Sequence, residues 1–148
     1  QDVATIGTAV ALNVAAPLML AAATAARRRQ GADCRILHVS SGAGRHVFPG
    51  WSVYCATKAA LDHHARAVVL DNTPGVRICS LAPGVIDTDM QAEIRATGLE
   101  RFPVRERFDA MKREGALASA EDCAARIVDH LLSDAFGTVP VADLRELK

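Results

Sequence analysis

The chain has 148 residues, half of them apolar and 23% charged, which is the balance of a single soluble domain with a hydrophobic core. Its 17 basic and 17 acidic residues give a net charge of zero, so the composition argues against a nucleic-acid-binding or acidic-membrane-binding protein. The four cysteines lie far apart and form no CxxC pair, which predicts free thiols, no metal site and a cytoplasmic protein.

The first predicted element is a helix over about residues 3–29. No charged residue occurs from 3 to 26, and three arginines close the stretch. Because the stretch is mostly alanine and contains Asn13 and Pro17, it gains little by entering lipid, whereas the terminal arginines suit the carboxyl end of a helix dipole. We therefore expect a helix buried in an α/β protein, with no role at a membrane.

Two short apolar runs, CRILHVSS (34–41) and VRICSLA (76–82), predict strands buried in a sheet. Between them, residues 52–70 predict a helix. Pro83 and Gly84 end the second strand, because proline cannot continue a strand inside a sheet.

The remaining third of the chain predicts further helices and one short strand. Residues 85–118 contain one or two amphipathic helices, and Ser119 with Asp122 has the spacing of a capping box that begins another helix. The run TVPVADL (138–144) predicts a last strand, which Pro140 would confine to an edge of the sheet.

Strands that alternate with helices predict a parallel sheet covered by helices, here the C-terminal part of a Rossmann-like doubly wound α/β fold. Ligands of such sheets bind in the loops that follow the carboxyl ends of strands, which begin here at Ser41 and Pro83. The chain shows no glycine-rich strand–turn–helix, and the strand at 34–41 would present an unpaired edge. We expect residues 1–148 to be the C-terminal catalytic and substrate part of one domain, with its glycine-rich nucleotide-binding part absent from this sequence.

Tyr54, the only tyrosine, precedes Lys58 by one helical turn, so the two side chains share a helix face. A phenol normally has a pKa of about 10, and a neighbouring ammonium group lowers it, which makes tyrosine a useful acid or base near a carbonyl carbon. The spacing alone is weak, because an aromatic residue at a helix start followed by a solvated lysine gives the same pattern.

Three further positions support a site. Ser41 ends a predicted strand, where its hydroxyl can hold a substrate carbonyl, although a turn serine is an equal explanation. Asn13 is the strongly polar side chain of the apolar helix and can hold a water or pin a loop. Gly84 lets a flat ring approach the backbone, and Thr88 offers a hydroxyl to an amide or phosphate.

Four motifs, NVAAP (13–17), SSGAG (40–44), YCATKAA (54–60) and PGVIDTDM (83–90), in this order and spacing resemble the short-chain dehydrogenase/reductase family. The resemblance covers essentially the whole chain. It implies hydride transfer involving a nicotinamide cofactor and a catalytic set of Asn13, Ser41, Tyr54 and Lys58. It also implies that the cofactor is bound by Tyr54, Lys58, Pro83, Gly84, Ile86 and Thr88.

Within the family, the motifs are similar to those of benzil reductases and sepiapterin reductases. This narrower resemblance implies NADP(H), with NAD(H) not excluded, and a small-molecule carbonyl substrate: a diketone, an aromatic ketone or a pterin-like side chain. It implies that Asp143 grips a pterin ring, although a surface aspartate fits as well, and that Trp51 walls the pocket or belongs to the core. The implied substrate-binding residues are Ser41, Gly42, Trp51, Tyr54, Gly84 and Asp143.

Two functions follow from these residues. The first, which the resemblance implies, is an NADPH-dependent carbonyl reductase, with Tyr54 as proton donor and a homodimer or homotetramer formed through helices 3–29 and 53–70. The alternative is a truncated, non-catalytic fragment or association module that keeps only those helical faces. A glycine-rich nucleotide-binding half in the same protein would favour the first.

Overall fold

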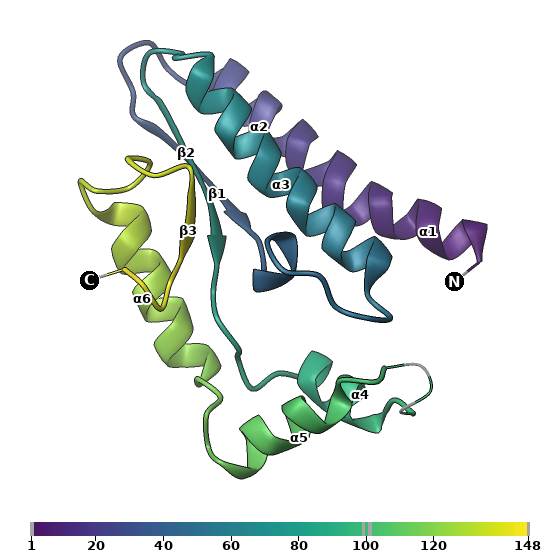
Figure 1. The fold of residues 1–148 in the computed structure, drawn as a ribbon. Helices are drawn as coiled ribbons and strands as arrows, with labels where there is room; N and C mark the ends of the chain where they lie inside the picture. The colour runs from purple at the N-terminus through teal and green to yellow at the C-terminus, as the bar shows by residue number, and fades with distance from the viewer. Residues whose placement is uncertain (1, 99, 101, 148) are drawn as a thin grey trace.

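A computed structural model describes residues 2–98, 100 and 102–147 (Figure 1). The chain begins with α1 (Val3–Val10) and α2 (Ala16–Arg27), which one wide, π-helical turn (Ala11–Ala15) joins into a continuous helix. The elements that follow are β1 (Cys34–Val39), α3 (Ser52–Leu70), β2 (Val76–Ala82), α4 (Asp89–Ala96), α5 (Arg105–Arg113), α6 (Ala120–Leu132) and β3 (Val141–Asp143).

The strands form one parallel sheet in the order β1-β2-β3, which confirms the predicted fold class. β1 and β2 pair from Cys34 opposite Val76 onward. β3 lies at the other edge, as Pro140 predicted, and the carbonyl of Pro140 accepts a hydrogen bond of 2.8 Å from the backbone N–H of Ser80. Among the described strands β1 has β2 as its one partner, so its other edge is open as expected.

Helices cover both faces of the sheet (Figure 1). Because side chains of a strand alternate between faces, Cys79 and Leu81 of β2 pack with Cys123 of α6 and with Phe136 in the main core cluster. Ser80, on the opposite face, reaches α3. The Ser119 hydroxyl accepts a 3.0 Å hydrogen bond from the backbone N–H of Asp122, which confirms the predicted start of α6.

The expectation that the N-terminal helix is buried was wrong for the described chain. Of its residues only Ala21 is buried, whereas Leu12, Met19 and Leu20 are each about two-thirds exposed. The helix runs beside α3 and the open edge of β1 (Figure 1), so one side of it has neighbours and the other side faces solvent. By length and composition, Val3–Arg27 would be able to cross a membrane, a test that core helices of soluble proteins also pass.

Residues 85–118 contain two helices, α4 and α5, as predicted. They form a lobe beyond the carboxyl ends of the strands (Figure 1), and Ile94, Phe102 and Phe108 make its buried centre. Trp51, which precedes α3, packs against this centre. The lobe is thereby fixed to the loop that leads into the Tyr54 helix.

Candidate active site

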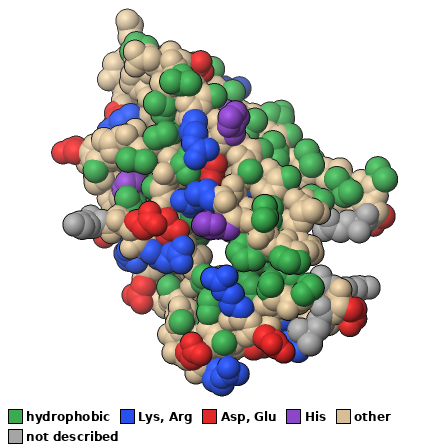
Figure 2. All heavy atoms as spheres, viewed as in Figure 1, with side chains coloured by type: hydrophobic (Ala, Val, Ile, Leu, Met, Phe, Trp, Pro, Cys, Tyr) green, Lys and Arg blue, Asp and Glu red, His purple; other side chains and the backbone are tan. Residues whose placement is uncertain are grey.

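A cleft of about 460 Å³ lies where the loops after β1 and β2 meet the α4–α5 lobe. Figure 2 shows the surface hollowed between the sheet layer and this lobe, with hydrophobic and basic side chains around the hollow. The carboxyl ends of parallel strands are the expected place for a ligand in such a sheet.

The cleft brings together the predicted site residues from four separate segments. Those that line it are Asn13, Ser41, Gly42, Trp51, Tyr54, Lys58, Pro83, Gly84, Ile86 and Thr88. Of the predicted set, Asp143 alone is not among the lining residues.

Tyr54 and Lys58 project from adjacent turns of α3, and the Lys58 ammonium nitrogen lies 5.7 Å from the centre of the Tyr54 ring. That nitrogen donates a 2.9 Å hydrogen bond to the backbone carbonyl of Val39 at the end of β1. Burial lowers the pKa of Lys58, and the negative charge of Asp62 partly opposes this effect. The lysine is thus anchored beside the phenol rather than extended into solvent.

Ser41 follows β1 in extended backbone conformation and begins the short turn Gly42–Gly44. Its hydroxyl oxygen accepts a 3.2 Å hydrogen bond from the backbone N–H of Ala43. No acceptor among the described residues takes the hydroxyl hydrogen, so the side chain keeps a donor for a ligand.

Asn13 lies in the wide turn between α1 and α2 and is half-buried. A wide turn of this kind inside an α-helix often marks a functional position, because it shifts the side chains that follow. Asn13 here lines the cleft on the side where Lys58 also lies.

The segment after β2 forms the opposite wall of the cleft. Gly84 has a φ of +89°, a left-handed conformation that favours glycine. Thr88 stands at the N-terminus of α4 but makes no side-chain capping bond there, so among the residues that the structure describes its hydroxyl has no partner in the helix.

Trp51 fulfils both roles that its sequence context allowed. It stacks on Phe102 at 4.7 Å between ring centres and meets Tyr54 edge-on at 5.3 Å. It also lines the cleft. Packing in the lobe therefore fixes the ring that borders the Tyr54 phenol.

Arg145 occupies the cleft where Asp143 was expected. Asp143 ends β3, is 5% exposed, and accepts a bidentate pair of hydrogen bonds from Arg145, of 2.9 Å from Nε and 2.7 Å from Nη2. The guanidinium lowers the pKa of the Asp143 carboxyl and, in return, its own pKa is raised. The sequence held a signal for this pair, an aspartate two residues before an arginine after an edge strand, which our reading missed.

Asp62 is a second residue that the sequence reading left without a role. It is 1% exposed on α3, and its Oδ1 accepts hydrogen bonds of 2.6 Å from Ser40 and 2.7 Å from Ser80. The Arg45 Nε lies 3.8 Å from Oδ2. Asp62 therefore ties the ends of β1 and β2 to the helix of Tyr54 and Lys58.

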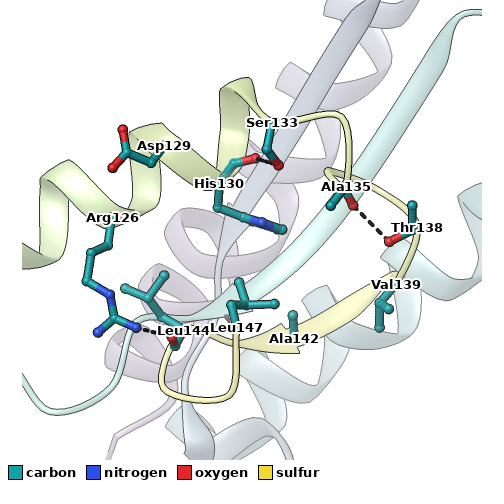
Figure 3. A pocket seen from close by; sticks show the side chains of 10 residues that line it. All are labelled: Arg126, Asp129, His130, Ser133, Ala135, Thr138, Val139, Ala142, Leu144 and Leu147. Carbon is teal, nitrogen blue, oxygen red and sulfur yellow. Dashed lines mark hydrogen bonds between the residues drawn. The ribbon is translucent and has the colours of Figure 1, made fainter.

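A second cavity, of about 440 Å³, lies between α6 and the outer edge of β3 (Figure 3). Arg126 there donates a 2.6 Å hydrogen bond to the carbonyl of Leu144, and burial lowers the pKa of His130. No predicted site residue lines this cavity.

The fold and the main cleft define an α/β protein with a ligand site at the carboxyl ends of its parallel strands. Residues 1–98 match the family described as short chain dehydrogenase. The chain belongs to this family, whose members are nicotinamide-dependent oxidoreductases, and the resemblance seen in the sequence is confirmed.

Characterised relatives agree with this assignment. The chain is 38% identical over 133 residues to the benzil reductase ((S)-benzoin forming) of Bacillus cereus, a match that covers 87% of this chain and 53% of that protein. It is 33% identical over 138 residues to the sepiapterin reductase of Meriones unguiculatus, covering 92% and 52% of the two chains.

A solved short-chain dehydrogenase/reductase from Burkholderia vietnamiensis is 47% identical and matches with a TM-score of 0.55, covering 99% of this chain and 54% of its own. The chain thus spans about half the length of the curated relatives it matches.

Proposed function

We propose that this protein is an NADPH-dependent carbonyl reductase, with Tyr54 as the proton donor. The observation that carries the proposal is the convergence of Asn13, Ser41, Tyr54 and Lys58 on one cleft at the carboxyl ends of the strands. The substrate would be a small carbonyl compound such as a diketone or an aromatic ketone, reduced to the alcohol. The names of the benzil and sepiapterin reductases support this class of substrate.

Each residue has a role that its position allows. Tyr54 would give its proton to the carbonyl oxygen, while the Lys58 cation stabilises the negative charge that develops on the phenol oxygen. Ser41, with its unused hydroxyl hydrogen, would hold the carbonyl oxygen in place. Asn13 would hold a water that returns a proton to the Lys58 side of the site.

The residues of the cleft fit the nicotinamide and ribose end of the cofactor. When bound, the reduced nicotinamide supplies the hydride that goes to the carbonyl carbon. Tyr54 and Lys58 would bind its ribose, and the Thr88 hydroxyl its carboxamide or phosphate. Pro83, Gly84 and Ile86 would lie along the ring. The choice of NADPH over NADH comes from the narrower resemblance of the motifs.

We propose further that residues 1–148 are the C-terminal part of one domain, with the pyrophosphate of the cofactor held by a glycine-rich half outside this sequence. The half-length match to the relatives and the open edge of β1 support this. The complete protein would be a cytoplasmic homodimer or homotetramer formed through helices 3–29 and 53–70.

One observation fits the alternative of an association module without catalysis, and it fits the oligomer of the reductase equally well. The exposed apolar side chains of the N-terminal helix, Leu12, Met19 and Leu20, form a face that a partner helix would cover. Titration of this 148-residue chain with NADPH, followed by nicotinamide fluorescence, tests whether these residues bind the cofactor without a glycine-rich half. We expect no tight binding, and a micromolar dissociation constant would contradict the division of the site between two halves.

The test of catalysis is Tyr54→Phe in the full-length protein. The variant keeps the ring that packs on Trp51 but lacks the proton, so we expect NADPH oxidation with a diketone to fall by about two to four orders of magnitude. Cofactor binding should change little. Thr138→Val is the matched control, since it also removes a hydroxyl group but lies outside the lining of this cleft. Unchanged turnover in Tyr54→Phe would refute the role assigned to it.

A further inference from the structure

The side chain of Arg145 is fixed in orientation by Asp143, which lies two residues earlier in the chain. Asp143 accepts hydrogen bonds from the backbone N–H, Nε and Nη2 of Arg145, at 3.0, 2.9 and 2.7 Å. A guanidinium held by one carboxylate in this bidentate way has little freedom to rotate. Its Nη1 makes no hydrogen bond to any described residue, so a donor remains for a ligand.

The backbone opposite makes room for this side chain. A Cβ on Gly84 would lie 3.4 Å from Cγ and Cδ of Arg145, so the arginine stem lies directly against the Gly84 backbone. Arg145 is thereby placed on the wall of the cleft that the segment after β2 forms. The position of Arg145 therefore depends on two contacts, one with Asp143 at the end of β3 and one with the Gly84 backbone.

The charge of the cleft has one sign. The charged side chains that line it are Lys58, Arg107 and Arg145, and no aspartate or glutamate occurs among the described lining residues. Aromatic rings of Phe48, Trp51, Tyr54 and Phe108 supply flat apolar surface beside them. A ligand complementary to this cleft has an aromatic group and a negatively charged or strongly accepting group.

Asp143 is poorly placed to hold a pterin ring. Such a ring presents N–H groups that need an acceptor, whereas Oδ1 of Asp143 already accepts two hydrogen bonds from Arg145 and Oδ2 accepts one, and the residue is 5% exposed. The exposed group at this point of the cleft is the Arg145 guanidinium, which is a hydrogen-bond donor.

We propose that Arg145 determines substrate class, and that the preferred substrates are aromatic 2-oxo acids, whose carboxylate it binds next to the reacting ketone. The inference rests on the proposed carbonyl reductase function and specifies which group of the substrate, a carboxylate, stands next to the reacting carbonyl. The same donor chemistry would suit a phosphate of the cofactor, so the experiment must separate the two sources.

The test compares phenylglyoxylate with its methyl ester in the full-length protein at saturating NADPH. The two compounds share the aryl ketone and differ in charge, so the ratio of their kcat/KM values isolates the carboxylate. We expect Arg145→Met to lower the acid-to-ester ratio about tenfold, the lower end for a charge-assisted hydrogen bond because the arginine is largely exposed. Arg145→Lys keeps the charge and should lose less. Arg113→Met, on α5 outside the cleft lining, should leave the ratio unchanged.

A second variant keeps the test valid if Arg145→Met folds poorly, since that change leaves Asp143 buried without its partner. The double variant Asp143→Asn, Arg145→Met removes both charges and should show the same fall in ratio. An unchanged ratio in an active enzyme would overturn this inference alone, and a raised KM for NADPH with an unchanged ratio would assign Arg145 to the cofactor. If the wild type turned over sepiapterin faster than phenylglyoxylate, the proposed preference for aromatic 2-oxo acids would also be contradicted. Wild type without activity on any carbonyl compound would overturn the proposed function as well.

Discussion

Removal of the Asp62 carboxylate should destabilise the protein far more than removal of an exposed acidic group on the same helix. Asp62 is 1% exposed, and its Oδ1 accepts the hydroxyl hydrogens of Ser40 and Ser80. In Asp62→Ala both hydroxyls lose their acceptor in the folded protein, because the methyl group cannot replace the carboxylate oxygen.

The size of the effect follows from these contacts. Each orphaned hydroxyl costs about 1 to 3 kcal/mol, so the two in Asp62→Ala should together lower the free energy of unfolding by about 2 to 6 kcal/mol. Relief of the buried charge offsets part of this cost, because Oδ2 has no hydrogen-bond partner among the described residues and lies 3.8 Å from the nearest Arg45 nitrogen. Asp62→Asn keeps one acceptor oxygen and should lose only about 1 kcal/mol.

The assay is equilibrium urea unfolding of the full-length protein, followed by circular dichroism. Asp71→Ala, at the exposed carboxyl end of α3, is the control and should change stability by less than about 0.5 kcal/mol. If Asp62→Ala unfolds at the same urea concentration as this control, the hydrogen bonds to Ser40 and Ser80 do not hold the strand ends to α3.

Two further predictions follow from the same structure. Burial lowers the pKa of His38 to about 4 beside His64, whose ring nitrogen lies 3.1 Å away, so the unfolded chain binds more protons between pH 4 and 6.5. The free energy of unfolding should therefore be highest above pH 6.5 and fall by about 1 to 3 kcal/mol towards pH 4. Urea unfolding of His38→Phe across this range should show a smaller fall. An equal pH slope in both proteins would contradict the lowered pKa assigned to His38. Gly84→Ala should cost about 1 kcal/mol of unfolding free energy, since φ is +89° there, and should reduce turnover, because relief of that strain would move backbone that lines the cleft. Gly42→Ala has no positive φ and open space around its Cβ, so its effect should be milder. Equal kcat/KM in the two glycine variants would argue against a close fit at Gly84.

The sequence predicted the sheet well because its strands are short apolar runs between strong turn signals. β1 and β2 lie where 34–41 and 76–82 indicated, and Pro140 marked the edge position of β3. β1 ends at Val39, two residues before the predicted end. The backbone N–H of Ser40 still donates a hydrogen bond to Leu81, and its side chain donates one to Asp62. Such a tertiary contact leaves no local signal.

Burial and side-chain direction were harder to predict. An alanine-rich apolar stretch has the same composition whether one side or all sides of the helix are covered, so the exposure of Met19 and Leu20 was not foreseen. Residues two apart in an extended strand share a face, so alternation alone does not distinguish Asp143 from Arg145. Asp143 ends β3 and Arg145 lies in the turn that follows, where its side chain pairs with Asp143 and lines the cleft, and the predicted strand 138–144 gave no indication of that turn.

The segments that form the cleft are distant along the chain, from Asn13 to Arg145, and three of them follow strands that pair in parallel. Ser80 and Val141 become neighbours only after the whole of α4, α5 and α6 has been enclosed as a loop. Closing such loops costs chain entropy before any contact repays it, so assembly of this kind is slow and depends on long-range encounters. Arg145 should therefore reach its position in one of the last steps of folding. A partly folded chain would then contain Tyr54, the proposed proton donor, without the arginine to which we assign substrate selection.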